Sequence, residues 1–157
     1  SSPGISLMQE GISYLAASEL PCLIVNIVRG TPGLGGIGPA QADYLQATKG
    51  GGHGDYKTIV LAPSTVQEAV EHVGLAFDLA FKYRNPVIIL GDGILGQMME
   101  PVILPPEKKA ETMEPEWAVT GTKDHSQRVV HSCSLSNESV EKLVHKLFAK
   151  YALIEKA

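Results

Sequence analysis

Three short runs of apolar residues limit what this chain can fold into. They span Cys22–Val28, residues 58–62 and residues 86–90, and none of them alternates apolar with polar side chains. Strands that are apolar on both faces are typical of a parallel sheet covered on both sides. We therefore predict an α/β fold in which helices flank a parallel sheet.

Helical patterns lie between the predicted strands. Residues 64–84 carry an apolar stripe, and Thr65 and Glu68 have the spacing of a capping box at its start. A shorter helix is predicted for residues 39–48. Strand and helix thus alternate as they do in βαβ units. The longer stripe comprises Val66, Ala69, Val70, Val73, Phe77 and Ala80, and the shorter one Ala40, Tyr44 and Ala47.

The first residues also predict a helix, with Ser2 as its N-cap and Pro3 at its first position. A helix in an α/β fold usually follows a strand, and no strand pattern precedes this one. We therefore hypothesise that the chain is a fragment that begins in the middle of a fold. The stripe of this helix comprises Ile5, Met8, Ile12 and Leu15.

The rest of the chain divides into an arm and a last helix. Residues 105–135 contain prolines, scattered charge and little periodicity, which predicts a linker or an extended arm that crosses a surface. A helical stripe resumes after Ser136, which is a suitable cap. We expect a partial α/β domain over residues 1–104, then the arm, then a C-terminal helix over residues 136–157 that leads to a further domain. The last stripe comprises Val140, Leu143, Val144, Leu147, Tyr151 and Ile154.

Charge and composition exclude several classes of protein. The net charge is -4, the pI is about 5.7, and no stripe of lysine or arginine offsets this balance. We therefore expect no binding to nucleic acid or to acidic membranes. No apolar run approaches the ~20 residues that a membrane span needs, and no signal peptide is visible.

Cysteine is used sparingly, at Cys22 and Cys133 alone. Cys22 lies in an apolar run and is predicted to be a small core residue. An iron–sulfur cluster normally needs four thiolates, so this chain cannot hold one by itself. His131 and Cys133 lack further ligands at metal spacing, and we predict no metal site. The reducing cytoplasm is the compartment that suits this pattern.

A glycine-rich loop, RGTPGLGGIG, follows the first predicted strand. From Gly33 to Gly38 it fits the dinucleotide-binding pattern GxGxxG. That pattern needs its first glycine at the end of the strand and an acidic residue at the tip of the next strand. Here four residues precede Gly33, and the next strand ends at Pro63. A nucleotide-binding module remains an alternative that rests on this pattern alone.

Arg29 stands where ligands gather in open α/β sheets, outside the carboxyl end of a strand. Its planar guanidinium suits a carboxylate or a phosphate. Glycines such as Gly33 and Gly35 allow the backbone to approach a ligand or a partner subunit closely. The alternative is a surface arginine beside a flexible turn.

Two more residues are candidates by position. His53, in the glycine cluster KGGGHGD, is either a proton carrier, an interface residue or an ordinary surface histidine. Asp92 follows the third strand and is either a site residue or a turn residue before Gly93. The sequence DHS at residues 124–126 has the residue types of a catalytic triad, but neighbours in sequence cannot adopt its geometry.

Six strings, in one order, resemble a known family: SSPGISLMQEGISYL, LPCLIVNIVRGTPGLG, PAQADYLQATKGGGHGDY, LAPSTVQEAV, AFDLAFKYRNPVIIL and GQMMEPV. They closely resemble the α subunit of 2-oxoacid:ferredoxin oxidoreductases, and most of all its branched-chain (3-methyl-2-oxobutanoate) members. The resemblance runs nearly unbroken over residues 1–102 and continues more thinly into the last helix.

The resemblance implies a subunit of a thiamin-diphosphate-dependent enzyme that converts a 2-oxo acid to acyl-CoA, CO2 and reduced ferredoxin. This subunit would hold the aminopyrimidine ring, and a β subunit would bind the diphosphate and Mg2+. Iron–sulfur clusters and coenzyme A would be held elsewhere in an oligomeric complex with ferredoxin-like or γ subunits. Pyruvate- or 2-oxoglutarate-specific members of the family are the alternatives, and a pure assembly surface is a non-enzymatic one.

The resemblance also implies roles for single residues. Arg29 matches the family arginine that faces the substrate carboxylate, and Thr31 would lie beside it. The glycines would shape a loop of the active site and interface. The family glutamate that activates the ring lies upstream of the region matching Ser1, so we expect the isolated chain to be inactive and to bind the cofactor poorly. The residues implied to border the cofactor pocket are Ser1, Ser2, Pro3 and Gly4.

Overall fold

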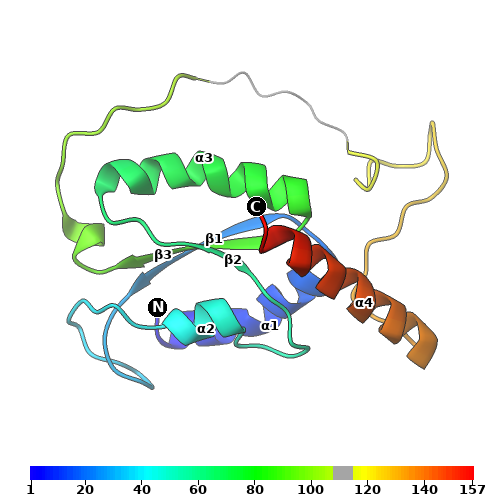
Figure 1. The fold of residues 1–157 in the computed structure, drawn as a ribbon, viewed down its shortest axis with the longest axis horizontal. Helices are drawn as coiled ribbons and strands as arrows, with labels where there is room; N and C mark the ends of the chain where they lie inside the picture. Colours follow the sequence, from blue (N-terminus) through cyan, green and yellow to red (C-terminus); the bar gives the residue numbers. More distant parts are fainter. Residues whose placement is uncertain (108–114) are drawn as a thin grey trace.

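A three-stranded parallel sheet forms the centre of the chain (Figure 1). The computed structural model describes residues 1–107 and 115–157. The strands β1 (Cys22–Val28), β2 (Ile59–Leu61) and β3 (Pro86–Asp92) lie in the order β1-β3-β2. The predicted α/β fold with a parallel sheet is therefore confirmed.

The middle strand, β3, is the most buried element of the fold. Val87, Ile88 and Ile89 are all buried, because β3 has a hydrogen-bonded neighbour on each side and helices on both faces. β3 is also longer than predicted, since its last two residues pair with Ile27 and Val28 of β1. A buried strand of this kind needs apolar side chains on both faces, which is why its sequence does not alternate.

Helices cover the two faces of the sheet. In Figure 1, α3 (Val66–Tyr83) lies on one side, and α1 (Pro3–Ala17) and α2 (Tyr44–Lys49) lie on the other. Each face has its own apolar cluster. The α3 side contains Ala76, Ala80, Val87 and Ile89, and the α1 side contains Ile5, Ile12, Ala16, Ile24, Ala47, Tyr56 and Ile88, with Cys22 packed against it.

The buried faces of α1 and α3 are rotated from those predicted. On α1 the buried residues include Gln9 and Ala16, whereas Met8 is half-exposed. On α3, Ala76 and Ala80 lie against the sheet, whereas Val73 and Phe77 are half-exposed. Small side chains allow a helix to approach a sheet closely, so the alanines are favoured at the contact.

The start of α3 is close to the prediction. The Thr65 hydroxyl accepts a hydrogen bond from the Glu68 backbone N–H at 3.1 Å. The Glu68 carboxylate accepts from the backbone N–H and the hydroxyl of Ser64, both at 2.7 Å, instead of from the backbone N–H of Thr65. The cap is therefore displaced by one residue from the reciprocal capping box.

The short helix predicted over residues 39–48 is wrong at its start. Pro39 forms an isolated antiparallel bridge with Arg29, and the Ala40 N–H donates to the carbonyl of Val28. These bonds keep the chain extended beyond β1, so α2 begins only at Tyr44. Asp43, with a φ of 57°, makes the sharp turn into the helix.

The described part of the predicted arm contains no helix or strand between Met98 and Ser136, apart from turns. Its first portion is fastened to α3, because the side-chain amide of Gln67 donates to the carbonyl of Ile103 and accepts from its N–H. Trp117 contacts Phe81 near the end of α3. Residues 108–114 of the predicted linker lie outside the described residues.

The last helix, α4 (Asn137–Ile154), is held to the body by a cluster of charges around Glu19. Its cap is Ser136, as predicted, with the hydroxyl accepting from the Ser139 N–H. Lys146 and Lys150 both donate to the buried Glu19 carboxylate. Arg84 donates from Nε to the Glu19 carbonyl at 3.0 Å and accepts at its own carbonyl from Lys150 at 3.1 Å.

The surroundings of Glu19 favour the ionised form of its carboxyl group. Burial acts to raise the pKa of Glu19, but the hydrogen bond from Lys146 and the positive charges of Lys150, Lys146 and Arg84 outweigh it and hold the pKa below its ordinary value of 4.5. Because the folded-state pKa is depressed, the stabilisation is present above the unfolded pKa and is lost as the pH falls through the folded pKa.

We predict that Glu19→Gln lowers the free energy of unfolding by about 1–3 kcal/mol at pH 7, because it leaves the ammonium of the mostly buried Lys150 without its carboxylate partner. The difference from the unsubstituted chain should shrink below pH ~4.5, where the glutamate becomes protonated. Urea denaturation between pH 3 and pH 7 measures both effects. Glu138→Gln is the control, since its exposed pair with Lys142 should contribute less than about 0.5 kcal/mol; equal losses in both variants would contradict the prediction.

Candidate functional site

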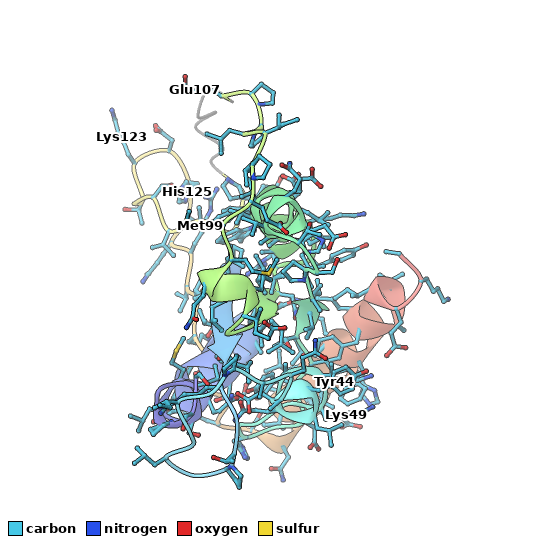
Figure 2. The ribbon with its side chains drawn as sticks, turned by 90° about the vertical axis from the view of Figure 1, so that its left-hand side faces the viewer. Tyr44, Lys49, Met99, Glu107, Lys123 and His125 are labelled. Atoms are coloured by element: carbon cyan, nitrogen blue, oxygen red, sulfur yellow. The ribbon has the colours of Figure 1, made fainter. Side chains whose placement is uncertain are left out.

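The carboxyl ends of the three strands open into one cavity of about 540 Å3. Ligands in open α/β sheets bind at this end of the strands. Figure 2 views the molecule from this end, with Tyr44 on α2 at one side and Met99 just beyond the short 3-10 helix η1 (Leu95–Gln97). Residues that line the cavity include Val28 from β1, Leu90 and Asp92 from β3, Ser64 after β2, and Gln41 and Tyr44.

The cavity is mostly apolar and has one polar pair. The Gln41 amide donates to Asp92 Oδ2 at 3.4 Å, while Asp92 Oδ1 accepts from the Leu95 N–H at 2.7 Å. The hydrogen bond from the Leu95 N–H lowers the pKa of the Asp92 carboxyl, and the weaker hydrogen bond from Gln41 acts in the same direction. Asp92 thus ends β3, holds the turn into η1 through the Leu95 N–H, and also lies in the cavity wall, so the two roles considered for it are compatible.

The loop after β1 is a compact structure held by its own hydrogen bonds. The Gly36 N–H donates to the Gly30 carbonyl at 2.7 Å, and the Gly30 N–H donates to the Gly38 carbonyl at 3.0 Å. From the start of α1, the Ser2 hydroxyl lies 2.7 Å from the carbonyls of both Gly33 and Leu34. The first turn of α1 and the end of β1 therefore hold this loop between them.

Gly35 is required by the shape of this loop. Its φ is +77°, and an added Cβ would lie 3.0 Å from the Gly30 carbonyl oxygen and 3.1 Å from Ser2 Oγ. Gly33 also has a positive φ, of +72°, but an added Cβ there would meet nothing within 4 Å. A side chain at Gly35 would therefore displace neighbouring atoms of the loop, whereas a side chain at Gly33 would displace none.

The glycine loop is not a dinucleotide-binding loop. In such a loop the last glycine lies in the start of a helix, whose N-terminus receives the phosphates. Here the chain continues without a helix from Gly38 to Tyr44. The nucleotide-binding alternative is therefore wrong, and the reason is the bridge and hydrogen bonds that keep residues 39 and 40 extended.

Arg29 is half-buried at the base of the loop. Its backbone N–H donates to Ser1 Oγ at 3.2 Å, and Nη2 of its guanidinium donates to the Leu34 carbonyl at 2.7 Å. A guanidinium has five N–H donors, so one loop contact leaves others for a ligand. The structure thus brings Arg29 together with Ser1, Ser2 and the loop glycines.

The other predicted candidates divide between this loop, the first turn of α1 and a second groove. Thr31 is an exposed loop residue with a φ of 69°, and Pro3 and Gly4 form the first turn of α1. His53 lines a second groove, of about 560 Å3, between α1 and α4, where Cys133 also lies. Residues 124–126 form no triad: the ring nitrogens of His125 form hydrogen bonds with the Thr120 hydroxyl and the Ser126 carbonyl, and Figure 2 places His125 far from Tyr44.

Sequence reasoning missed the polar residues that position the cavity wall. Asn26, buried within β1, donates to the Asp43 carboxylate at 3.1 Å and so fixes the turn into α2. A lone asparagine in the apolar run CLIVNIV was a visible signal of such a role. Gln41 had no comparable signal, since its contact with Asp92 depends on the path of the chain after β1.

Comparison with protein families supports the resemblance noted in the sequence. Residues 1–145 match the family model described as pyruvate flavodoxin/ferredoxin oxidoreductase, thiamine diphosphate-binding.

None of the helices in the described residues is long and apolar enough to cross a membrane.

Two relatives illustrate the likeness. The chain is 51% identical over 155 residues to the ketoisovalerate oxidoreductase subunit VorB of Methanothermobacter thermautotrophicus, covering 99% of this chain and 44% of that subunit. It is 40% identical over 158 residues to the 2-oxoglutarate synthase subunit KorA of Archaeoglobus fulgidus, covering 96% of this chain and 45% of that subunit. The chain therefore spans less than half the length of these relatives.

A solved structure has the same fold. The chain superposes on the 2-oxoglutarate:ferredoxin oxidoreductase of Magnetococcus marinus, which has 2-oxoglutarate, coenzyme A and succinyl-CoA bound, with a TM-score of 0.73 and 26% identity. The match covers 99% of this chain and 32% of the other. Fold, sequence and family model agree, and the chain belongs to the thiamine diphosphate-binding domain family of the pyruvate flavodoxin/ferredoxin oxidoreductases.

Proposed function

We propose that this chain is the pyrimidine-side part of a 2-oxoacid:ferredoxin oxidoreductase that acts on a branched-chain 2-oxo acid. The reaction would yield acyl-CoA, CO2 and reduced ferredoxin. The observation that carries the proposal is the cavity at the carboxyl ends of the strands, beside the loop that holds Arg29, in a chain of this family. The identity of 51% with a ketoisovalerate oxidoreductase subunit favours the branched-chain substrate over pyruvate or 2-oxoglutarate.

The residues present fit the ring end of thiamin diphosphate better than its diphosphate end. The cavity has apolar walls from Val28, Leu90 and Met98, and a polar edge at Gln41 and Asp92. No lysine or arginine is among the described residues that line it, and a diphosphate would need such cations or a metal ion. When bound, the cofactor supplies the carbanion chemistry that decarboxylates 2-oxo acids.

Arg29 would bind the substrate carboxylate in this proposal. Its contact with the Leu34 carbonyl orients the guanidinium, and its remaining N–H groups can donate to a carboxylate. Ser1 and Ser2 would act by holding the backbone around Arg29 and the loop, and Thr31, Pro3 and Gly4 would be neighbours of the same site. His53 would belong to an interface.

The remaining parts of the enzyme would come from other chains. A β subunit would bind the diphosphate and Mg2+, and ferredoxin-like or γ subunits would carry the iron–sulfur clusters. Both cysteines of this chain are free, which suits a cytoplasmic enzyme. Residues 1–104 would form part of the cofactor domain, residues 105–135 the arm, and residues 136–157 the helix that leads to a further domain.

We predict that Arg29→Ala in the intact complex lowers kcat/KM for the 2-oxo acid by about 10²-fold, because a charge-assisted hydrogen bond to the substrate is lost. Arg29→Lys should recover only part of this, since an ammonium lacks the planar fork. Steady-state reduction of a viologen dye measures both variants. The control is Arg128→Ala. Like Arg29, Arg128 donates to a backbone carbonyl, that of Ala118, but it lies in the arm, so its loss should leave turnover unchanged.

The same variants separate catalysis from a pure assembly role. If the loop served assembly alone, Arg29→Ala complexes that still form would turn over normally. Size-exclusion chromatography of each variant before the assay establishes that the subunits remain together, and normal turnover in an intact complex would contradict a substrate role for Arg29.

Gly35→Ala should raise KM more than Gly33→Ala does. Both substitutions place a side chain at a positive φ, which costs about 1–2 kcal/mol, but only the first also presses on Ser2 and the Gly30 carbonyl. The loop must then move, and with it the Leu34 carbonyl that orients Arg29. Parallel measurement of KM and thermal unfolding tests this; equal KM values for the two variants would show that the loop does not position the arginine.

The substrate class is tested with the intact subunit and its co-purifying partners, isolated without oxygen. CoA-dependent viologen reduction is measured with 3-methyl-2-oxobutanoate, pyruvate and 2-oxoglutarate. We expect the highest kcat/KM with the branched acid. A preference for either of the other acids would reassign the chain within the family, and no reduction with any of them would contradict the proposed reaction.

A further inference from the structure

One wall of the cavity is formed by η1 and the segment that follows it. Ile94, Leu95 and Met98 line the cavity, and Met98 comes directly after η1. The Met98 backbone N–H donates to the Ile94 carbonyl at 3.0 Å. From there the chain runs past the N-terminal end of α3 (Figure 1). We call residues 98–103, which form neither helix nor strand, the strap.

The strap is fastened to the first turn of α3 by three hydrogen bonds. Glu100 Oε2 accepts from the Val66 N–H at 3.0 Å. The side-chain amide of Gln67 accepts from the Ile103 N–H at 2.8 Å and donates to the Ile103 carbonyl at 3.1 Å. The strap is therefore tied to α3 at two points, Glu100 and Ile103, while its start is tied to η1.

Glu100 completes the cap of α3. The first backbone N–H groups of a helix have no partner within the helix. Thr65 Oγ1 accepts from the Glu68 N–H, and the Glu100 carboxylate, 34 residues away along the chain, accepts from the Val66 N–H. The helix dipole places partial positive charge at this end, which favours a carboxylate. Because Glu100 does not itself line the cavity, the strap can be loosened there without changing the cavity wall directly.

Little apolar burial supports these bonds. Met99 is 96% exposed and Ile103 is 82% exposed, and all three hydrogen bonds between the strap and α3 are open to solvent. Segments with few buried apolar contacts and exposed hydrogen bonds open at a small cost in free energy, and the mobile loops of binding sites are drawn from such segments. Met98 is the exception, because it lies against the cavity and its flexible side chain can adapt to a ligand.

We propose that the strap is a movable wall of the cavity, and that Glu100 and Gln67 are positioning residues that hold Met98 against a bound ligand. This inference rests on the proposed function, in which the ligand is the ring end of thiamin diphosphate. The fastened strap is the form that binds the ring more tightly, because Met98 then completes the apolar wall that Val28 and Leu90 begin. A ligand that favours one of two forms shifts the population towards that form.

Hydrogen–deuterium exchange in the intact complex tests the movement. The complex is freed of thiamin diphosphate, and exchange of the peptide covering residues 98–104 is followed before and after the cofactor and Mg2+ are added. We expect the strap amides to exchange about 5- to 10-fold more slowly with the cofactor bound, a ratio typical of two coupled equilibria. A peptide from the middle of α4 is the control and should not change. Equal exchange of the strap in both states would overturn the proposal.

Glu100→Lys should raise the Kd of thiamin diphosphate for the complex by about fivefold, because linkage limits the loss to the factor seen in exchange. The lysine is repelled by the N-terminus of α3, so the strap is freed. Glu100→Gln keeps an acceptor oxygen and should have a smaller effect. The control for loss of a charge is Glu138→Gln, on α4, which should leave the Kd unchanged. Calorimetry measures the Kd, and exchange of the α3 peptide establishes that the helix stays folded.

Coupling to Met98 separates a positioning role from a merely structural one. Met98→Ala should raise the Kd by itself, and adding Glu100→Lys should then raise it little further, because the side chain to be positioned is gone. The matched control is Met99→Ala, which removes an exposed methionine of the same strap and should leave the effect of Glu100→Lys intact. Additive losses in the Met98 pair, or an unchanged Kd in Glu100→Lys with a rapidly exchanging strap, would overturn the proposal.

These measurements do not depend on turnover. A complex whose strap becomes protected by thiamin diphosphate but that reduces no dye would contradict the proposed reaction and leave the movable wall supported. An active complex whose strap exchanges equally with and without the cofactor would have the opposite meaning.

Discussion

The hydrogen-bonded ladder of β3 with both of its neighbours is the constraint on which the rest of this structure depends. Since β1, β2 and β3 run in parallel, their carboxyl ends meet at one edge, and every connection has to return across a face. The helices consequently cover both faces, and the loops gather at the two ends. The Arg29 loop, the Asp92 turn and the residues after β2 become neighbours only because of this register.

Polar groups then determine how the outer elements attach. α4 buries few apolar side chains, chiefly Leu147 and Tyr151, and its position is specified by Glu19 and the cations around it. The turn into α2 is likewise specified by the contact of Asn26 with Asp43. Removing a charged side chain from water costs free energy unless the charge is paired. These polar contacts therefore favour one position of α2 and α4 over others more than they raise the free energy of unfolding.

The sequence predicted the elements better than their contacts. A continuous apolar run predicted both ends of β1 correctly, and the capping residues Thr65 and Ser136 predicted the starts of α3 and α4. Strand burial and helix caps are local signals, which is why the sequence alone reveals them. The start of α2 was predicted wrongly, since a tertiary bridge from Arg29 to Pro39 overrides helical spacing. The cavity could not be predicted, because its wall combines residues from separate strand ends whose register no local pattern encodes.

Arg84 illustrates how a residue with an unfavourable backbone can still be the best choice. It ends α3 with a φ of 48°, a conformation in which glycine is usual. Its side chain, however, lies over the ring of Trp117 at 4.8 Å and donates to the Glu19 carbonyl. Exchange for glycine would relax the backbone and at the same time disconnect the arm from the end of α1. A consensus design that follows helix-capping statistics would therefore choose the wrong residue at this position.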